Sequence, residues 1–96
     1  MSNTYWLNGK YIQKEEAYVS PLTHTLHYGL GAFEGVRSYI SHDKKSVNIF
    51  RLKEHTERLF ESAKIINVEI NHSFDEVMEA QLGVIKKSEL HDAYIR

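Results

Sequence analysis

The sequence predicts an α+β domain in which an antiparallel sheet built of hairpins is covered by two helices. Three observations support this class. Short aromatic runs flank an Asn8-Gly9 pair, side chains alternate with a period of two after Ala32, and apolar residues recur every three or four positions from Leu52 onward. The first two patterns are typical of hairpins and strands and the third of helices. Because the strand patterns come first and the helix patterns second, an α+β layer arrangement is favoured.

Two hairpins are predicted in the first half of the chain. In the first, residues 5–7 and 10–12 flank the Asn-Gly pair, the strongest short hairpin signal because both residues accept positive φ angles. In the second, a strand that starts at Ala32 runs into a polar loop at residues 41–46 and returns at residues 47–50. The alternation gives this strand a mixed, site-like face with Phe33, Gly35, Arg37 and Tyr39, and an aliphatic face with Ala32, Val36 and Ile40.

Two helices are predicted after the hairpins, followed by a strand that starts at Ala93. The first helix runs from Leu52 to about Ile66, and the second follows Ser73, which forms a capping-box signature with Glu76. Each helix has an apolar stripe at spacings of three and four residues. The stripes consist of Leu52, His55, Leu59, Ala63 and Ile66 in the first helix, and of Val77, Ala80, Val84 and Ile85 in the second.

Size and composition limit the classes of function. The 96 residues make one domain, which buries about two-thirds of its unfolded surface. A formal charge of −1 gives no electrostatic reason to bind nucleic acid or an anionic membrane, and no apolar run approaches the roughly 20 residues that span a bilayer. The amino terminus lacks the basic and apolar blocks of a signal peptide. With no cysteine in the chain, thiolate chemistry is excluded, and a soluble intracellular protein is expected.

The stretch from residue 21 to residue 37 concentrates functional side chains around glycines at positions 29, 31 and 35. Glycines permit positive φ angles and close approach of the backbone. Such a stretch is too rich in donors, acceptors and stacking surface for an ordinary connection, and it is predicted to form the wall of a binding site. Its chemically useful members are His24, His27, Tyr28, Phe33, Glu34 and Arg37.

Other interpretations of the same stretch remain open at this point. His24, His27 and Glu34 are of the types that bind zinc or iron, but their spacing matches no metal motif. Histidines that precede a glycine turn more often fix the backbone by hydrogen bonds. The glycines resemble a phosphate loop only loosely, because the lysine and the serine or threonine of a P-loop are missing and a strand, not a helix, follows.

Two further candidates lie in the second half of the chain. Arg58 has Glu54 four residues before it, so the pattern favours an exposed ion pair, and the alternative is that the planar guanidinium grips a phosphate. Tyr94 and Arg96 are two apart on a strand and therefore project from one face, with Ile95 opposite. A phenol beside a guanidinium is suited to bind a carboxylate, and a plain surface pair is the alternative.

The chain resembles the amino-terminal small domain of branched-chain amino acid aminotransferases, which are fold type IV pyridoxal 5′-phosphate enzymes. The resemblance rests on WLNGK, PLTHTLHYGLGAFEGVRSY, FRLKEHTERLFESAKI and AYIR, taken in this order. Each motif is loose by itself, but four of them in order and at matching distances are highly specific. The resemblance covers residues 1–96 as a single small domain and implies that the larger carboxy-terminal domain is absent from this chain.

The resemblance implies roles for individual residues that bind substrate. Phe33 matches an aromatic that lines the pocket for the aliphatic side chain, Gly35 keeps that wall low, and Arg37 lies close by. Tyr94 corresponds to a residue near the substrate α-carboxylate, and Arg96 to one that receives the side-chain carboxylate of glutamate. Apolar walls together with an arginine at the rim would let one pocket accept both leucine-like side chains and glutamate.

The resemblance also implies how the cofactor and a second subunit are bound. Arg58 matches the arginine that holds the phosphate of pyridoxal 5′-phosphate, which acts as the electron sink. Tyr28 matches a tyrosine that reaches into the partner's site in the family dimer, so a homodimer or a higher homo-oligomer with a shared site is expected. The Schiff-base lysine and the acidic partner of the ring nitrogen belong to the carboxy-terminal domain, and Lys64 does not match that lysine. No catalytic residue is therefore expected in this chain, which is expected to be inactive by itself.

The implied activity is transfer of an amino group between leucine, isoleucine or valine and 2-oxoglutarate, by a cytoplasmic enzyme. A D-amino acid aminotransferase or an aminodeoxychorismate lyase of the same fold type is an alternative. A stand-alone binding or interaction module without catalysis is the alternative from another class.

Overall fold

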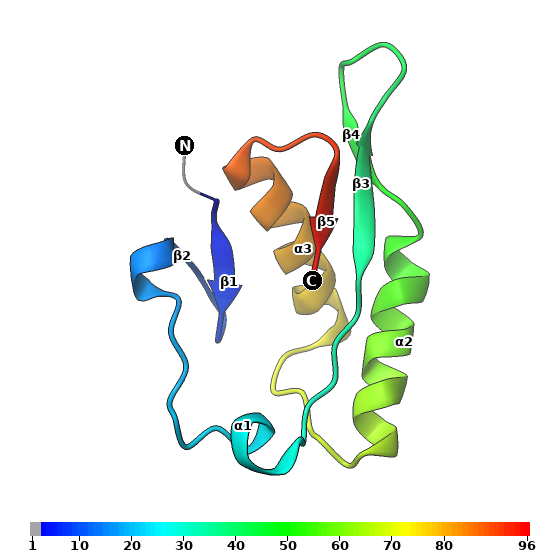
Figure 1. Cartoon of the computed structure of the whole chain (residues 1–96). Coiled ribbons are helices and arrows are strands. Elements are labelled where there is room, and N and C mark those ends of the chain that lie inside the picture. The colour runs from blue at the N-terminus through cyan, green and yellow to red at the C-terminus, as the bar shows by residue number, and fades with distance from the viewer. Residues whose placement is uncertain (1–2) are drawn as a thin grey trace.

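The computed structural model describes residues 3–96 and confirms the α+β class, with antiparallel strands and two long helices (Figure 1). Met1 and Ser2, part of the amino-terminal stretch considered above for a signal peptide, lie outside the described residues. In chain order the elements are β1 (Tyr5–Leu7), β2 (Lys10–Ile12), a 3₁₀ turn (Lys14–Glu16), α1 (His24–Tyr28), β3 (Val36–Ile40), β4 (Val47–Ile49), α2 (Leu52–Ile65), α3 (Phe74–Ser88) and β5 (Ala93–Ile95).

The strands form two sheets instead of one. The first hairpin is a separate pair, β1-β2, while the second hairpin is joined by the last strand in the order β4-β3-β5, with antiparallel pairing throughout. In the larger sheet Val36 lies opposite Ile95 and Arg37 opposite Tyr94. This register places the end of the chain beside the residues that lead into β3.

A buried serine fastens β5 to the centre of the larger sheet. Ser38 has no exposed surface, its Oγ donates to the carbonyl oxygen of His91 at 2.7 Å, and the N–H of Ala93 donates to the same Oγ at 3.1 Å. Buried hydroxyl groups are stable only when their hydrogen bonds are satisfied, and this one is. The turn into β5 and the register of β5 on β3 are therefore fixed together.

The first hairpin has the predicted turn, and the second begins later than predicted. Asn8 and Gly9 have φ angles of 51° and 88°, as a tight two-residue hairpin turn requires. The strand predicted from Ala32 starts only at Val36, because no described strand pairs with residues 32–35. From Val36 onward buried and exposed residues alternate as expected, although residues 32–35 form an extended connection instead of a strand.

Helix α2 has a polar residue at the centre of its packed face. Thr56 is 1% exposed, donates from Oγ1 to the carbonyl oxygen of Leu52 at 2.8 Å, and accepts from Gln81 of α3 at 2.9 Å. The predicted apolar stripe omitted this threonine, because hydrophobicity is a poor guide to a hydroxyl whose bonds are all satisfied. The stripe was also wrong at its end: α2 ends at Ile65, and Ile66 is 38% exposed.

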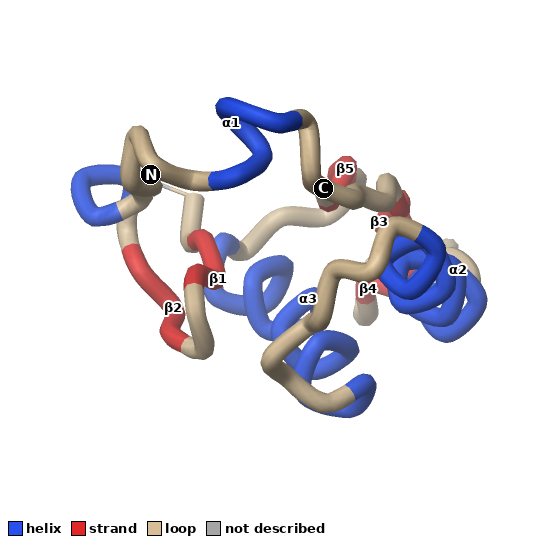
Figure 2. Tube along the Cα trace, turned by 90° about the horizontal axis from the view of Figure 1, so that it is seen from below, coloured by secondary structure: helices blue, strands red, loops and turns tan. Residues whose placement is uncertain are grey.

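Helix α3 lies between the β1-β2 hairpin and α2 (Figure 2). The predicted capping box is confirmed, because the Oγ of Ser73 accepts from the N–H of Glu76 and the Glu76 carboxylate accepts from the N–H of Ser73. At the other end the Oγ of Ser88 accepts from the backbone N–H of Thr4 at 2.8 Å. One side of α3 therefore carries the amino-terminal hairpin while the other packs on α2.

A projecting arm, residues 18–31, contains the short helix α1, which was not predicted. All of its residues except Thr23 are exposed, and Figure 1 shows α1 at the lower end of the molecule, away from the helix pair. Gly29 ends α1 in the left-handed conformation with a φ angle of 67°, the usual place of a glycine after a helix. Across residues 3–96, no helix is both long enough and apolar enough to cross a membrane.

We expect Gly83→Ala to destabilise the protein by about 1–3 kcal/mol, because a methyl group here overpacks the contact between α3 and the hairpin. An added Cβ would lie 2.0 Å from the Oη of Tyr11. In a Tyr11→Ala background the same change should instead stabilise by about 1 kcal/mol, the normal helix preference for alanine over glycine. Urea unfolding of the four proteins measures this, and equal effects of Gly83→Ala in both backgrounds would contradict the contact.

Candidate functional site

The predicted pair of Tyr94, on β5, and Arg96, just after it, meets the connection before β3. Arg96 donates from Nη2 to the Oη of Tyr94 at 3.2 Å, and its Cζ lies 5.3 Å from the centre of the Tyr94 ring. The same Cζ lies 4.9 Å from the centre of the Phe33 ring, within the range of a cation–π contact. Phe33 and Tyr94 are both largely exposed. The structure therefore brings Phe33, Tyr94 and Arg96 together as one open aromatic and cationic surface.

Gly35 is required by this surface because it lies under the tyrosine. A Cβ built at Gly35 would be 1.9 Å from the Oη of Tyr94 and 2.6 Å from its Cζ, closer than side-chain atoms approach one another. Any larger residue would push the phenol away from its position beside Arg96. The structural requirement for glycine at position 35 is therefore the space taken by the ring of Tyr94.

Arg37 lies on the same exposed face of β3, opposite Tyr94 in the register. Its Cζ is 5.8 Å from the centre of the ring of Tyr39, two residues further along the strand. The arginine thus extends the polar end of the surface formed by Phe33, Tyr94 and Arg96, and the alternation predicted for this strand is confirmed at both residues.

Arg58 does not form the predicted ion pair with Glu54. Its partner is Glu34 in a bidentate pair, with Nε to Oε2 at 2.7 Å and Nη2 to Oε1 at 2.5 Å. Glu54 instead pairs with Arg51 at 3.4 Å. The interpretation from spacing alone was wrong because a carboxylate 24 residues away in the sequence offers two parallel hydrogen bonds, which a neighbour on an exposed helix rarely does.

Two further groups hold the Glu34 carboxylate. His55 donates from Nδ1 to Oε1 at 3.1 Å, and the backbone N–H of Gly35 donates to the same oxygen at 3.3 Å. Hydrogen bonds from Arg58 lower the pKa of Glu34 to about 2, burial acts against this, and the bonds from His55 and Gly35 support it. Glu34 is therefore ionised at neutral pH and ties the connection before β3 to α2.

The structure keeps Tyr28 apart from this surface. Tyr28 lies on α1, is 71% exposed, and its ring packs on those of its neighbours His24 and His27. His27 donates from Nε2 to the carbonyl oxygen of Pro21 at 2.5 Å, so the prediction that a histidine fixes the backbone here is confirmed for this residue. Among residues 3–96 no three His, Asp or Glu side chains form a group that could hold a metal ion, and Glu34 is already bound by Arg58.

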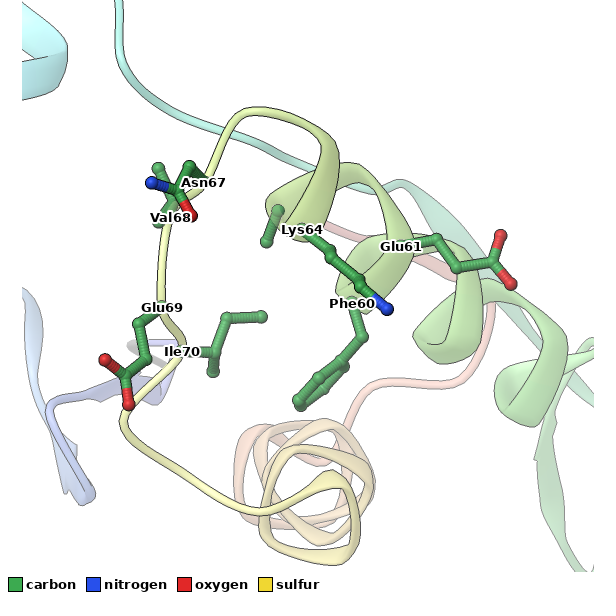
Figure 3. Close-up of a pocket in the computed structure, with 8 residues that line it drawn as sticks. Phe60, Glu61, Lys64, Asn67, Val68, Glu69 and Ile70 are labelled. Atoms are coloured by element: carbon green, nitrogen blue, oxygen red, sulfur yellow. The ribbon is translucent and has the colours of Figure 1, made fainter.

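Two hollows of the surface bear on the location of the site. One of about 670 Å³ lies between the end of α2 and residues 67–70 (Figure 3) and contains none of the predicted binding residues. A smaller apolar hollow of about 370 Å³ is lined by Phe33, Glu34 and Arg96 together with Trp6 and side chains of α3. We place the candidate site at this second hollow, because the paired carboxylate of Glu34 and the aromatic surface of Phe33 with Arg96 both line it, and neither lines the larger hollow.

Sequence reasoning missed what Glu34 and His55 do. The sequence patterns indicate Glu34 only as a polar member of a binding-site wall or a metal ligand, and His55 as a member of the apolar stripe of the first helix. Glu34 lies 21 residues before His55 and 24 before Arg58 in the sequence, and no local spacing indicates these contacts. The one available signal is that His55 and Arg58 are three apart on a helix and hence share a face.

We expect the Glu34 carboxylate to contribute stability that depends on pH. A group whose folded pKa is lowered contributes fully above its unfolded pKa, near 4.5, and loses that contribution as the pH falls to about 2. The stability advantage of the parent over Glu34→Gln, measured by denaturant unfolding, should therefore shrink across this range. Glu54→Gln, in an exposed pair, is the control and should cost less than about 1 kcal/mol at any pH. An advantage over Glu34→Gln that stayed constant would contradict the ionised cluster.

Comparison with known proteins gives the family of the chain. The branched-chain-amino-acid aminotransferase of Pseudomonas aeruginosa is 47% identical over 91 residues, which cover 95% of this chain and 29% of that protein. A solved structure of the T.th. branched-chain amino acid aminotransferase complexed with N-(5′-phosphopyridoxyl)-L-glutamate superposes with a TM-score of 0.91 at 39% identity, over 98% of this chain and 31% of its own.

A second structure of the T.th. enzyme, complexed with 4-methylvaleric acid, gives a TM-score of 0.91 at 40% identity, covering 97% of this chain and 31% of its own. The chain thus spans less than a third of the length of the proteins it matches. The resemblance to branched-chain aminotransferases is confirmed. The family described as Amino-transferase class IV matches residues 31–96, most of the sequence and every residue of the site except Tyr28, and the chain belongs to that family.

Proposed function

We propose that this chain is the amino-terminal small domain of a pyridoxal 5′-phosphate-dependent aminotransferase that moves an amino group between leucine, isoleucine or valine and 2-oxoglutarate. The observation that carries this proposal is the 47% identity, over 95% of the chain, to a protein named for that activity. Superposition on a structure that contains a phosphopyridoxyl-glutamate conjugate supports both the cofactor and one of the two substrates.

The chain's own residues fit the phosphate end of the cofactor. Arg58 is 64% exposed, so its guanidinium is accessible. Glu34 occupies Nε and one side of Nη2, which leaves donors on the outer edge of the guanidinium. We assign Arg58 to the phosphate on this basis. When bound, pyridoxal 5′-phosphate supplies an electron sink for the reaction.

We propose that the surface around Phe33 and Arg96 binds the substrate. Phe33 is 69% exposed and offers an apolar wall to an aliphatic side chain. The absence of a side chain at Gly35 leaves room for the ring of Tyr94. Arg96 borders the same wall and can pair with the side-chain carboxylate of glutamate, which leucine lacks. Tyr94 is assigned to the region of the α-carboxylate, with Arg37 beside it on β3. One pocket can thereby accept both classes of substrate.

The groups that perform the chemistry are assigned to another part of a longer protein. Lys64 lies on α2 and lines the hollow of about 670 Å³, whose lining includes neither Tyr94 nor Arg96, and we assign it no catalytic role (Figure 3). The matched proteins are about three times as long as this chain, which supports a second domain that carries the Schiff-base lysine. We therefore propose that residues 1–96 bind and orient but do not catalyse by themselves.

We also propose a cytoplasmic homodimer in which Tyr28 contributes to the partner's site. The arm supports this, because Tyr28 is 71% exposed and Leu22 and Leu26 are 79% and 63% exposed beside it, an apolar surface that suits a protein contact. The absence of cysteine agrees with a reducing compartment. The alternatives within the fold type are not favoured, since the matched proteins are named as branched-chain aminotransferases.

If Arg58 holds the cofactor phosphate, Arg58→Ala in the complete protein should weaken binding of pyridoxal 5′-phosphate by about 10-fold to 100-fold, the value of hydrogen bonds to a charged group. Fold stability should fall as well, because the largely covered Glu34 carboxylate loses its bidentate partner, so the affinity is compared under conditions in which both proteins are folded. Lys53→Ala, an exposed cation on the same helix, is the control. Cofactor titration followed by absorbance measures the affinity. Equal affinities in variant and parent would contradict phosphate binding by Arg58 and leave only its ion pair with Glu34.

Arg96→Met should separate the two substrate classes. Loss of the charged partner should raise the KM for glutamate and 2-oxoglutarate by about 10-fold to 100-fold. The KM for leucine should change by less than about threefold, because the apolar wall from Phe33 remains. Lys45→Met, in the loop between β3 and β4, is the matched control for loss of a surface cation. Steady-state kinetics with leucine and with glutamate as the amino donor measures both KM values. An equal rise in KM for the two donors would contradict the role of Arg96 in binding the side-chain carboxylate.

A further inference from the structure

We propose that Glu34 is a positioning residue for Arg58: it fixes the guanidinium by one edge so that the other edge is presented to a phosphate, and His55 holds Glu34 in place. This inference rests on the proposed function, because the phosphate role of Arg58 is part of that function. Glu34 itself need not touch the cofactor.

The bidentate geometry decides which donors remain. A guanidinium has five N–H donors in one plane. Glu34 takes Nε–H and one hydrogen of Nη2, at 2.7 and 2.5 Å. Within residues 3–96, Nη1 donates to no side chain or carbonyl group. Two of the three remaining donors, one on Nη1 and one on Nη2, therefore lie side by side at the end of the guanidinium, the arrangement that binds two phosphate oxygens in parallel.

Glu34 is restrained well enough to act as a fixed support. Its side chain is only 13% exposed, whereas that of Arg58 is 64% exposed. Hydrogen bonds from His55 and from the N–H of Gly35 hold Oε1 from two further directions. His55 and Arg58 lie three residues apart on α2, so both reach the carboxylate from one face of that helix. The position of the exposed Arg58 guanidinium is therefore set by a carboxylate that is largely covered.

The carboxylate also links the two halves of the proposed site. Glu34 lies between Phe33 and Gly35 in the connection that forms the proposed substrate wall, and its bonds reach α2, which carries Arg58. A movement of Arg58 would therefore move the wall. Preorganised groups bind more tightly because less side-chain entropy is lost on binding, and an arginine has much rotamer entropy to lose.

The negative charge of Glu34 acts in the opposite direction, since it repels a phosphate dianion. At an edge open to solvent this repulsion is weakened by water and salt. The restraint on Arg58 is weakened less, because it is made of two short, direct hydrogen bonds to a carboxylate that is largely covered. We therefore expect restraint to exceed repulsion, and the two effects predict opposite signs for removal of Glu34.

The test is cofactor affinity in the complete protein that carries this chain. Glu34→Ala should weaken binding of pyridoxal 5′-phosphate by about threefold to 10-fold, the cost of ordering one long side chain. Binding of pyridoxal, which has no phosphate, should change by less than about twofold by the same reasoning. In an Arg58→Ala background, Glu34→Ala should have no further effect on the phosphorylated cofactor. Glu54→Ala, which removes the other glutamate that pairs with an arginine near α2, is the control.

Each other outcome overturns the inference in a recognisable way. Unchanged or tighter binding of the phosphorylated cofactor by Glu34→Ala would mean that Glu34 competes with phosphate. An equal loss for pyridoxal, or a loss that persists without Arg58, would mean a purely structural role. If Arg58→Ala alone leaves cofactor affinity unchanged, the proposed phosphate role fails first, and the role of Glu34 fails with it.

A second variant keeps the test decisive if Glu34→Ala does not fold. Glu34→Gln preserves the volume of the side chain but turns an amide N–H₂ toward one guanidinium nitrogen. In the cofactor-free protein, NMR relaxation of the Arg58 Nε–H group should report a restrained side chain in the parent and a mobile one in this variant. Equal mobility in the two proteins would contradict the positioning role, whatever the affinities are.

Discussion

The pairing of β5 with β3 is the constraint on which the rest of the site depends. β5 is three residues long, and by itself such a strand would not persist. It is held because the hydroxyl of Ser38, buried at the centre of β3, bonds the backbone on both sides of the turn into β5. This register brings Tyr94 and Arg96 to the residues that precede β3, 55 and more positions earlier in the sequence. The proposed substrate surface therefore depends on the antiparallel pairing of β3 with β5.

The site combines two contacts of different strength. Around Phe33, Tyr94 and Arg96 the contacts are exposed and aromatic, and a cation over a ring in water is worth about 0.5–1 kcal/mol. Around Glu34 the contacts are charged, bidentate and partly covered, which makes them stronger and more directional. A soft, adaptable wall suits a pocket that must accept side chains of several shapes. A rigid support suits a phosphate, whose geometry is always the same.

Local patterns predicted most of the fold because the physics behind them is local. Asn8 and Gly9 adopt positive φ angles in any context that lets the flanking residues pair, and Ser73 with Glu76 satisfies the N–H groups of its own helix. The errors occur where distant residues decide the outcome. Residues 32–35 have the alternation of a strand without a partner, and Thr56 is buried because Gln81 of another helix supplies its hydrogen bond.

The sequence by itself determined the order of the strands and of the two long helices, the turn of the first hairpin, the start of the capped helix and, through its resemblance to a family, which residues are proposed to bind the substrate and the phosphate. Only the tertiary structure decided which side chains hold one another. It replaced the expected Glu54–Arg58 pair with Glu34–Arg58, added His55, and showed that the ring of Tyr94 requires a glycine at position 35. The physical reason is that hydrogen bonds and steric contacts are set by distances in space. These groups come from a connection, a helix and the end of the chain, which are far apart in the sequence and meet only in the folded structure.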